Sequence, residues 1–240
     1  MSEVPKGRPS LRTRSVHVAA LVAAVFWLPS LASRVLAQDL AAAVDAFWGV
    51  SSPDEIDRAV ETILALDPDI EPLWTRLRAG AAYDADVTPG RQVLTRENAD
   101  GVEYRYELFV PDDYDPARRY PVRVYLHGGV ARPRRNEAPF WRNAERYARD
   151  DAIVVFPESW ADAMWWQASQ VENLTGMLND IKRRYNVNEN AVYLLGVSDG
   201  ATGDFYHAFK APTPWAAFLS FNGHPVVVAN AVTGVEGQMY

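Results

Sequence analysis

The stretch Ala191-Val-Tyr-Leu-Leu-Gly-Val-Ser-Asp-Gly200 decides the fold class of this chain. Its first half, Ala191 to Leu195, is short, apolar and rich in strand-forming residues, which is typical of a central parallel strand covered on both faces. The residues that follow, 201–210, have a helical pattern. The Gly-x-Ser-x-Gly motif therefore lies at a junction between a strand and a helix, and this context predicts a tight turn that exposes Ser198.

Ser198 is the candidate nucleophile. An unactivated serine hydroxyl is a poor nucleophile, so it has to be held on a tight turn near a base and beside hydrogen-bond donors for the developing negative charge. We expect Gly196 and Gly200 to leave room for this turn, because side chains there would collide with the neighbouring strand and helix. The alternative is a glycine-rich turn that carries an incidental serine.

A second motif, His127-Gly128-Gly129, ends the predicted strand Pro121 to Leu126 upstream of the serine. A loop at that place in such a sheet supplies a backbone N–H to an oxyanion hole. We expect the N–H groups of Asp199 and of Gly129 or Val130 to bind the oxyanion, because backbone amides are fixed dipoles that need no reorganisation. For His127 we favour a loop-anchoring hydrogen bond over a general base, and we keep it among the candidate substrate contacts.

Three tryptophans, Trp160, Trp165 and Trp166, follow the predicted strand that ends at Phe156. They come after the carboxyl end of that strand, where open α/β sheets bind ligands. They are candidates for a substrate pocket, and ordinary core packing is an equal alternative. The sequence also has three arginines that we expect to form a solvated loop or, less often, to steer an anionic substrate: Arg132, Arg134 and Arg135.

Two histidines follow Ser198. His207 lies nine residues further along the predicted helix, at an axial rise of about 13 Å, so we expect it to be a packed helix residue. His224 follows the predicted strand Ala216 to Phe221, which places it at the rim of the site. A role for His224 as the general base is the less favoured alternative, because the base of such a site normally comes from a later loop.

The amino-terminal residues 1–37 have the pattern of a secretory signal peptide. Four basic residues precede an apolar run from Val18 to Leu31, and the small residues of Val35-Leu36-Ala37 suit cleavage after Ala37. The run is shorter than a membrane span of about 20 apolar residues, which argues against an uncleaved anchor. The sequence therefore predicts a secreted or periplasmic protein with no stable membrane association after cleavage.

The composition of the 240-residue chain narrows the classes of function. Removal of residues 1–37 changes the formal net charge from −7 to −11, which disfavours nucleic acid as a partner. The chain has no cysteine, so disulfides, thiolate catalysis and cysteine-based zinc sites are excluded. We find no spacing typical of metal ligands and no cofactor motif, and we predict neither a metal nor a cofactor. The oligomeric state is not predicted.

The order of predicted elements indicates an α/β fold. Residues 38–90 are read as a small helical extension with its linker, and residues 91–240 as the main domain. In the main domain, Glu103 to Val110 alternates like an outer strand with one wet face. Phe140 to Arg149 is predicted to be helical. About six strands alternate with helices, which implies a mostly parallel sheet flanked by helices.

Three segments carry a resemblance to a known family: 125–129, 186–200 and 218–225. They resemble the esterase and peptidase-like branch of the α/β-hydrolase superfamily, which includes polyhydroxybutyrate depolymerase-like and feruloyl esterase-like secreted enzymes. The resemblance implies an α/β-hydrolase fold, Ser198 as nucleophile and Asp199 as an oxyanion donor. Many of these relatives have a second glycine where this chain has Ala201.

The resemblance implies hydrolysis of a small or polymeric carboxylic ester through an acyl-enzyme on Ser198. A serine peptidase of the same fold is an alternative, as is a non-catalytic binding protein that lacks a complete triad. The family core usually has eight strands, and its acid and histidine follow the last ones. From this we expect an incomplete hydrolase domain, with about six of the eight strands, that is truncated at its carboxyl end.

Overall fold

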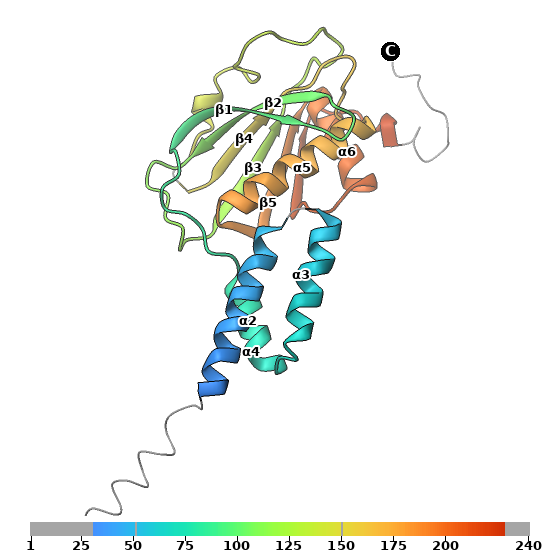
Figure 1. The fold of residues 1–240 in the computed structure, drawn as a ribbon. Coiled ribbons are helices and arrows are strands. Elements are labelled where there is room, and N and C mark those ends of the chain that lie inside the picture. Colours follow the sequence, from blue (N-terminus) through green and yellow to red (C-terminus); the bar gives the residue numbers. More distant parts are fainter. Residues whose placement is uncertain (1–30, 51, 150, 229–240) are drawn as a thin grey trace, which may run out of the picture. The chain divides into compact units, whose positions relative to one another are not determined.

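The computed structural model describes residues 31–50, 52–149 and 151–228 (Figure 1). The predicted signal segment lies mostly outside these residues, and the cleavage step is not addressed by them. The chain divides into two compact units, Met1–Ala81 and Ala82–Tyr240. No helix in the described ranges is long and apolar enough to cross a membrane.

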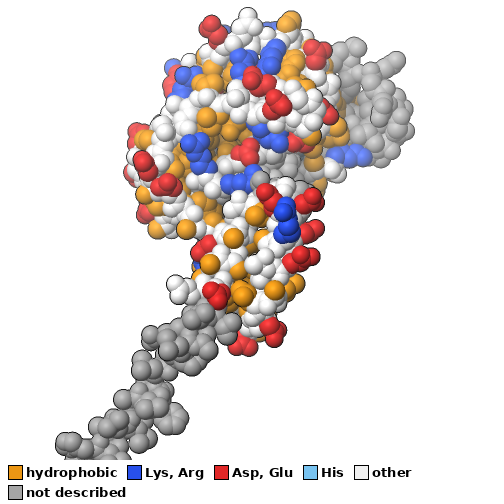
Figure 2. Space-filling model, in the orientation of Figure 1, with side chains coloured by type: hydrophobic (Ala, Val, Ile, Leu, Met, Phe, Trp, Pro, Cys, Tyr) orange, Lys and Arg blue, Asp and Glu red, His pale blue; other side chains and the backbone are white. Residues whose placement is uncertain are grey.

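The first unit consists of three helices, α2 (Leu31–Gly49), α3 (Pro53–Ala65) and α4 (Ile70–Ala79). The start of α3 follows from its sequence, because Ser52 and Glu55 form a reciprocal capping box. A small core joins the helices, made by Leu40, Ala43, Val44 and Ile63. Figure 2 shows hydrophobic side chains among charged ones on the surface of this unit. The exposed hydrophobic residues of its helices include Leu64, Ile70 and Trp74.

The second unit contains a mixed sheet of six strands in the order β1-β2-β4-β3-β5-β6. Strands β4, β3, β5 and β6 are mutually parallel, while β1 and β2 run antiparallel to their neighbours. The strands have the following bounds: β1 Gly90–Glu97, β2 Glu103–Val110, β3 Tyr120–Leu126, β4 Ile153–Pro157, β5 Val187–Val197 and β6 Ala217–Phe221. The six strands and the α/β class agree with the prediction.

One face of the sheet is covered by α5 (Ala168–Arg184) and α6 (Asp199–Lys210). The main core lies there, because alternate residues of β3 and β5 point to this face and meet the apolar stripe of α5. Its central members are Val122, Val124, Leu126, Leu174, Met177, Val192 and Leu194. On the opposite face, a smaller cluster of Phe109, Val154 and Phe156 packs with the half-buried aromatic rings of Tyr125 and Trp141.

Strand β2 differs from its prediction as an outer strand with one wet face. It lies between β1 and β4, and five of its last six residues are buried. The charged residue Glu107 is tolerated there at 0% exposure because its carboxylate pairs with Arg91 Nε at 2.8 Å and accepts the N–H of Phe140 at 2.7 Å. A buried carboxylate that pairs with a half-exposed arginine therefore occupies a position that the alternation predicts to face solvent.

The prediction of a helix over Phe140–Arg149 is wrong. Only a single 3₁₀ turn forms, η1 (Ala144–Arg146), and Asn143 before it has a left-handed backbone with φ of 59°. The backbone of Phe140 is bound at both ends, since its N–H donates to Glu107 and its carbonyl accepts from Arg135. These tertiary contacts, with the packing of Trp141 on the aromatic cluster, replace the helical hydrogen bonds that the local pattern favoured.

Candidate active site

Ser198 occupies the turn between β5 and α6 with a backbone conformation that is rare for a residue with a side chain. Its φ is 55° and its ψ is −121°, a strained conformation that projects the side chain outward. The turn is fixed from both sides, because the Ser198 N–H donates to the Phe221 carbonyl at 3.0 Å and the Ser198 carbonyl accepts from Thr202 N–H at 3.0 Å. Ser198 is exposed. This is the geometry of a nucleophile elbow.

The two glycines of the motif allow close backbone contacts at the elbow, as the sequence predicts. A Cβ added at Gly196 would lie 2.5 Å from the backbone nitrogen of Ala201. A Cβ added at Gly200 would lie 2.5 Å from the carbonyl carbon of Leu126. Side chains at these positions would therefore push α6 away from β5 and β3, and the prediction for both glycines is confirmed.

The loop after β3 lies directly against the serine. A Cβ added at Gly128 would lie 2.8 Å from Ser198 Cβ and 3.3 Å from Ser198 Oγ. The amides predicted to bind an oxyanion have an internal acceptor in this conformation: Gly129 N–H and Val130 N–H both donate to Asp199 Oδ2, at 2.8 and 3.0 Å. The loop and the elbow, which the sequence predicts to form one oxyanion hole, are therefore in contact through the Asp199 side chain. The motifs alone do not predict this contact.

His127 anchors this loop. Its Nε2 accepts the Ser159 N–H at 3.0 Å, so in the neutral ring the proton is on Nδ1 and is donated to the Gly128 carbonyl at 2.9 Å. Burial lowers the pKa of His127, which favours this neutral form. Both ring nitrogens are therefore engaged with the backbone. The arrangement is the loop-anchoring hydrogen bonding that we favoured for this residue.

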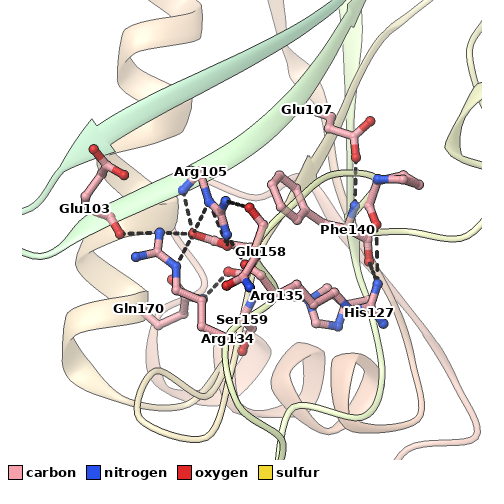
Figure 3. Close-up of polar contacts among 12 residues, drawn as sticks. Glu103, Arg105, Glu107, His127, Arg134, Arg135, Phe140, Glu158, Ser159 and Gln170 are labelled. Atoms are coloured by element: carbon pink, nitrogen blue, oxygen red, sulfur yellow. Dashed lines mark hydrogen bonds and ion pairs between the residues drawn. The ribbon is translucent and has the colours of Figure 1, made fainter.

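A buried carboxylate holds the following part of the same loop (Figure 3). Glu158 is 2% exposed and binds two arginines, with Arg105 Nη2 at 2.7 Å and Arg134 Nε at 2.9 Å. Arg105 Nη1 also donates to the Asn136 carbonyl at 2.6 Å, and Arg134 Nη2 to the Glu103 carbonyl at 2.7 Å. Arg134 was expected in a solvated loop; instead it ties the loop to β2 and to the end of β4.

The three candidate substrate-contacting tryptophans have different environments. Trp165 is fully buried, and its Nε1 donates to the His127 carbonyl at 2.8 Å. Trp160 is 8% exposed, with the guanidinium of Arg134 4.5 Å from its ring centroid. Trp166 is half-buried and packs against the main core. Trp165 and Trp160 thus contact the loop beside the serine, through the His127 carbonyl and the Arg134 guanidinium.

The two histidines after the elbow lie in different settings. His207 is 1% exposed, its Nε2 faces the Trp165 carbonyl at 3.1 Å, and burial lowers its pKa to about 4. His224 is exposed, its backbone N–H donates to Thr202 Oγ1 at 3.0 Å, and its Nδ1 accepts the Val226 N–H at 3.2 Å. Within the described residues, Ser198 Oγ has no hydrogen bond to either ring.

Asp204 is a buried carboxyl group behind the elbow that the sequence analysis did not single out. It is fully buried on α6, accepts from Ser220 Oγ at 3.3 Å, and has no partner for Oδ1 among the described residues. Burial raises its pKa to about 8, although hydrogen bonds from Ser220 and the Gly196 backbone oppose the shift. The sequence signal for a buried position was its place six residues after Ser198, on the face of the predicted helix that turns toward β6.

The described residues contain no group of three or more His, Asp or Glu side chains that could hold a metal ion.

The strand order, the strained serine between β5 and α6, and the His-Gly-Gly loop after β3 together define the α/β-hydrolase fold. No family model matches the chain. Acetylxylan esterase A from Emericella nidulans is 26% identical over 165 residues, which are 64% of this chain and 53% of that protein. The chain thus spans about half the length of this relative.

Solved structures of esterases are also similar. A thermostable esterase is 24% identical with a TM-score of 0.47, over 55% of this chain and 40% of that one. A ferulic acid esterase is 16% identical with a TM-score of 0.45, over 56% of this chain and 61% of that one. At this level of similarity, the fold assignment depends on the strand order and the elbow of the chain itself.

Proposed function

We propose that this chain carries the nucleophile-bearing part of a carboxylic ester hydrolase that works through an acyl-enzyme on Ser198. The observation that carries the proposal is the strained backbone of Ser198, with φ of 55°, on an exposed turn against the His-Gly-Gly loop. Strain of about 1–3 kcal/mol at a residue with a side chain persists only where the surrounding structure enforces it, and it concentrates at functional sites.

In the proposed reaction, Ser198 Oγ attacks the ester carbonyl and loses its proton to a base. The tetrahedral intermediate collapses, the alcohol leaves with a proton, and an acyl group stays on Ser198. Water then attacks the acyl-enzyme and releases the carboxylic acid. The backbone N–H of Asp199, in the first turn of α6, is proposed to bind the oxyanion, and the positive end of the helix dipole adds to the stabilisation there.

The proposed substrates are acetyl esters, including acetylated polysaccharide, because the similar curated protein is an acetylxylan esterase. The loop beside Ser198 is held by three buried groups, His127, Trp165 and Glu158. This loop is therefore held in place before a substrate binds. A peptidase reaction uses the same acyl transfer to serine, and hydrolysis of a peptide substrate in place of an ester would favour it.

His224 is a less favoured candidate for the general base that takes the Ser198 proton than a histidine from a later loop. Because its Nδ1 accepts the Val226 N–H, the neutral ring carries its proton on Nε2 and cannot accept another there without a change of tautomer. A His224→Ala variant that retains the activity of the native chain would exclude it.

The test of the proposed function is covalent labelling of Ser198 with a fluorophosphonate, combined with hydrolysis of p-nitrophenyl acetate. We expect labelling of the native chain and none in Ser198→Ala, while the matched variant Ser169→Ala labels like the native chain. The labelled peptide is identified by mass spectrometry. No labelling of the native chain would favour a non-catalytic binding protein.

We also propose that the chain is exported and cleaved after Ala37. Expression in a bacterial host followed by amino-terminal sequencing tests this, with Gln38 expected as the first residue of the exported protein. Recovery of the full-length chain in the cytosol alone would contradict it.

A further inference from the structure

We propose that the side chain of Asp199 is a positioning residue, which clamps the loop of residues 127–130 against the elbow and so holds Gly128 beside Ser198. The effect of the clamp on reactivity rests on the proposed function of Ser198. The clamp itself is a contact that can be tested without any activity.

Two amides of the loop share one acceptor. One carboxylate oxygen of Asp199 accepts two successive backbone amides, from Gly129 at 2.8 Å and from Val130 at 3.0 Å. Gly129 has a φ of 72°, a left-handed conformation that lets two neighbouring N–H groups converge on one point. Hydrogen bonds to an ionised acceptor are about twice as strong as neutral ones. The loop conformation and the carboxylate therefore fit each other.

The position of Asp199 in the chain connects the loop to the elbow. Asp199 directly follows Ser198 and is the first residue of α6, so its side chain links the loop to the residue next to the nucleophile. The loop is 70 residues away in sequence. Gly128 then contacts Ser198 so closely that an added Cβ would lie 2.8 Å from Ser198 Cβ. A displacement of the loop would change the surroundings of Ser198 Oγ directly.

The two donors, Gly129 N–H and Val130 N–H, are both used by the clamp. Each amide has a single hydrogen, and in this conformation the hydrogens of Gly129 and Val130 are directed at Asp199. Their work here is to fix the loop. A neutral side chain of the same shape would keep an acceptor for both amides, with weaker hydrogen bonds, and would place no negative charge beside a developing oxyanion. Asn at position 199 keeps an acceptor oxygen, whereas Ala removes it.

These properties separate the clamp from two other roles. If Asp199 only filled space, exchange of the Gly129 and Val130 amides would not depend on its acceptor oxygen and would be alike in Asp199→Ala and the native chain. If the carboxylate only blocked the amides from a substrate, Asp199→Ala would raise the reactivity of Ser198. The clamp predicts that Ala lowers the reactivity and Asn does not.

The experiment compares the native full-length chain with Asp199→Asn, Asp199→Ala and the exposed control Asp162→Ala. Hydrogen exchange at the amides of Gly129 and Val130, resolved by NMR, reports the clamp directly. We expect exchange to be roughly tenfold or more faster in Asp199→Ala, the equivalent of losing one hydrogen bond to a charged acceptor, and within about threefold of native in Asp199→Asn.

The rate of fluorophosphonate labelling at Ser198 reports the consequence. We expect a roughly tenfold loss in Asp199→Ala and a rate equal to or above native in Asp199→Asn. Where ester turnover is measurable, the loss should lie in kcat, with KM changed by less than about twofold. Unchanged amide exchange in Asp199→Ala, or labelling as fast as native, would overturn the proposal. If even the native chain is not labelled, the proposed function fails, while the exchange data still decide the clamp.

Discussion

The buried carboxyl of Asp204 makes a prediction that can be worked through in numbers. Burial raises its pKa from 3.8 to about 8. The folded state therefore favours the protonated acid, while the unfolded chain ionises at ordinary pH. The contribution of this group to stability is complete below pH 3.8 and is lost as the pH rises toward about 8. Replacement by Asn removes the titration and keeps an oxygen that can accept from Ser220 Oγ.

Linkage gives the size of the effect, because one proton bound only in the folded state changes the free energy of unfolding by about 1.4 kcal/mol per pH unit. Below pH 6.5 two buried histidines oppose it: burial lowers the pKa of His207 to about 4 and also lowers the pKa of His127, so both cost stability as the pH falls. The range from pH 6.5 to 8 is therefore the one in which Asp204 contributes most of the change in unfolding free energy. Over it, the native chain should lose about 2 kcal/mol that Asp204→Asn does not lose.

The assay is urea unfolding followed by tryptophan fluorescence at pH 6.5, 7, 7.5 and 8, for the native chain, Asp204→Asn and the exposed control Asp162→Asn. The quantity compared is the difference in unfolding free energy between each variant and the native chain as a function of pH. We expect a difference that grows with pH for Asp204→Asn and a constant one for Asp162→Asn. Parallel curves for native and Asp204→Asn would refute the argument that the fold holds this carboxyl protonated.

Three further predictions concern stability. Gly200→Ala should lower the free energy of unfolding by about 3 kcal/mol because the new methyl group meets the backbone of β3, while Gly49→Ala, with open space around it, should change it little; thermal unfolding compares them. Glu158→Gln should lower the free energy of unfolding by about 3 kcal/mol, and Glu172→Gln, at a side chain that is 41% exposed, by less than about 1 kcal/mol. Equal losses of unfolding free energy for the two variants in urea would contradict this. Between pH 6.5 and 5, the native chain should lose about 2 kcal/mol more unfolding free energy than His207→Gln does. The same pH dependence of the unfolding free energy in both proteins over this range would argue against a buried neutral ring.

The elbow was predictable because its determinants are local. The glycines at 196 and 200, the apolar strand before them and the helical pattern after them lie within about twenty residues, and each expresses a steric need of the backbone at that point. The strand count and the α/β class followed from the same short-range patterns. The identity of Ser198 as the exposed residue of the turn needed nothing from the rest of the chain.

The wrong and missing predictions come from contacts between residues that lie far apart in the sequence. Glu107 looked like a solvent-facing residue, and its partner Phe140, 33 residues away, was assigned to a helix. The buried Glu107 carboxylate, which pairs with the half-exposed Arg91 and accepts the Phe140 N–H, accounts for both errors, and sequence spacing does not reveal either partner. The contact of Asp199 with Gly129 spans 70 residues and depends on a carboxylate that follows the serine, so the motif located the residues but not their bonding.

The hydrogen bond from the Ser198 N–H to the Phe221 carbonyl ties the elbow to β6. Among the described residues, β6 pairs with β5 alone and has no buried residue, so it should open at lower free energy than β3 and β5, which lie between two strands. If Ser198 reacts as proposed, its labelling by a fluorophosphonate should fall on heating before the circular dichroism signal of the helices does. Fraying of β6, and not the melting temperature of the domain, would then set how long the elbow keeps the conformation that exposes Ser198.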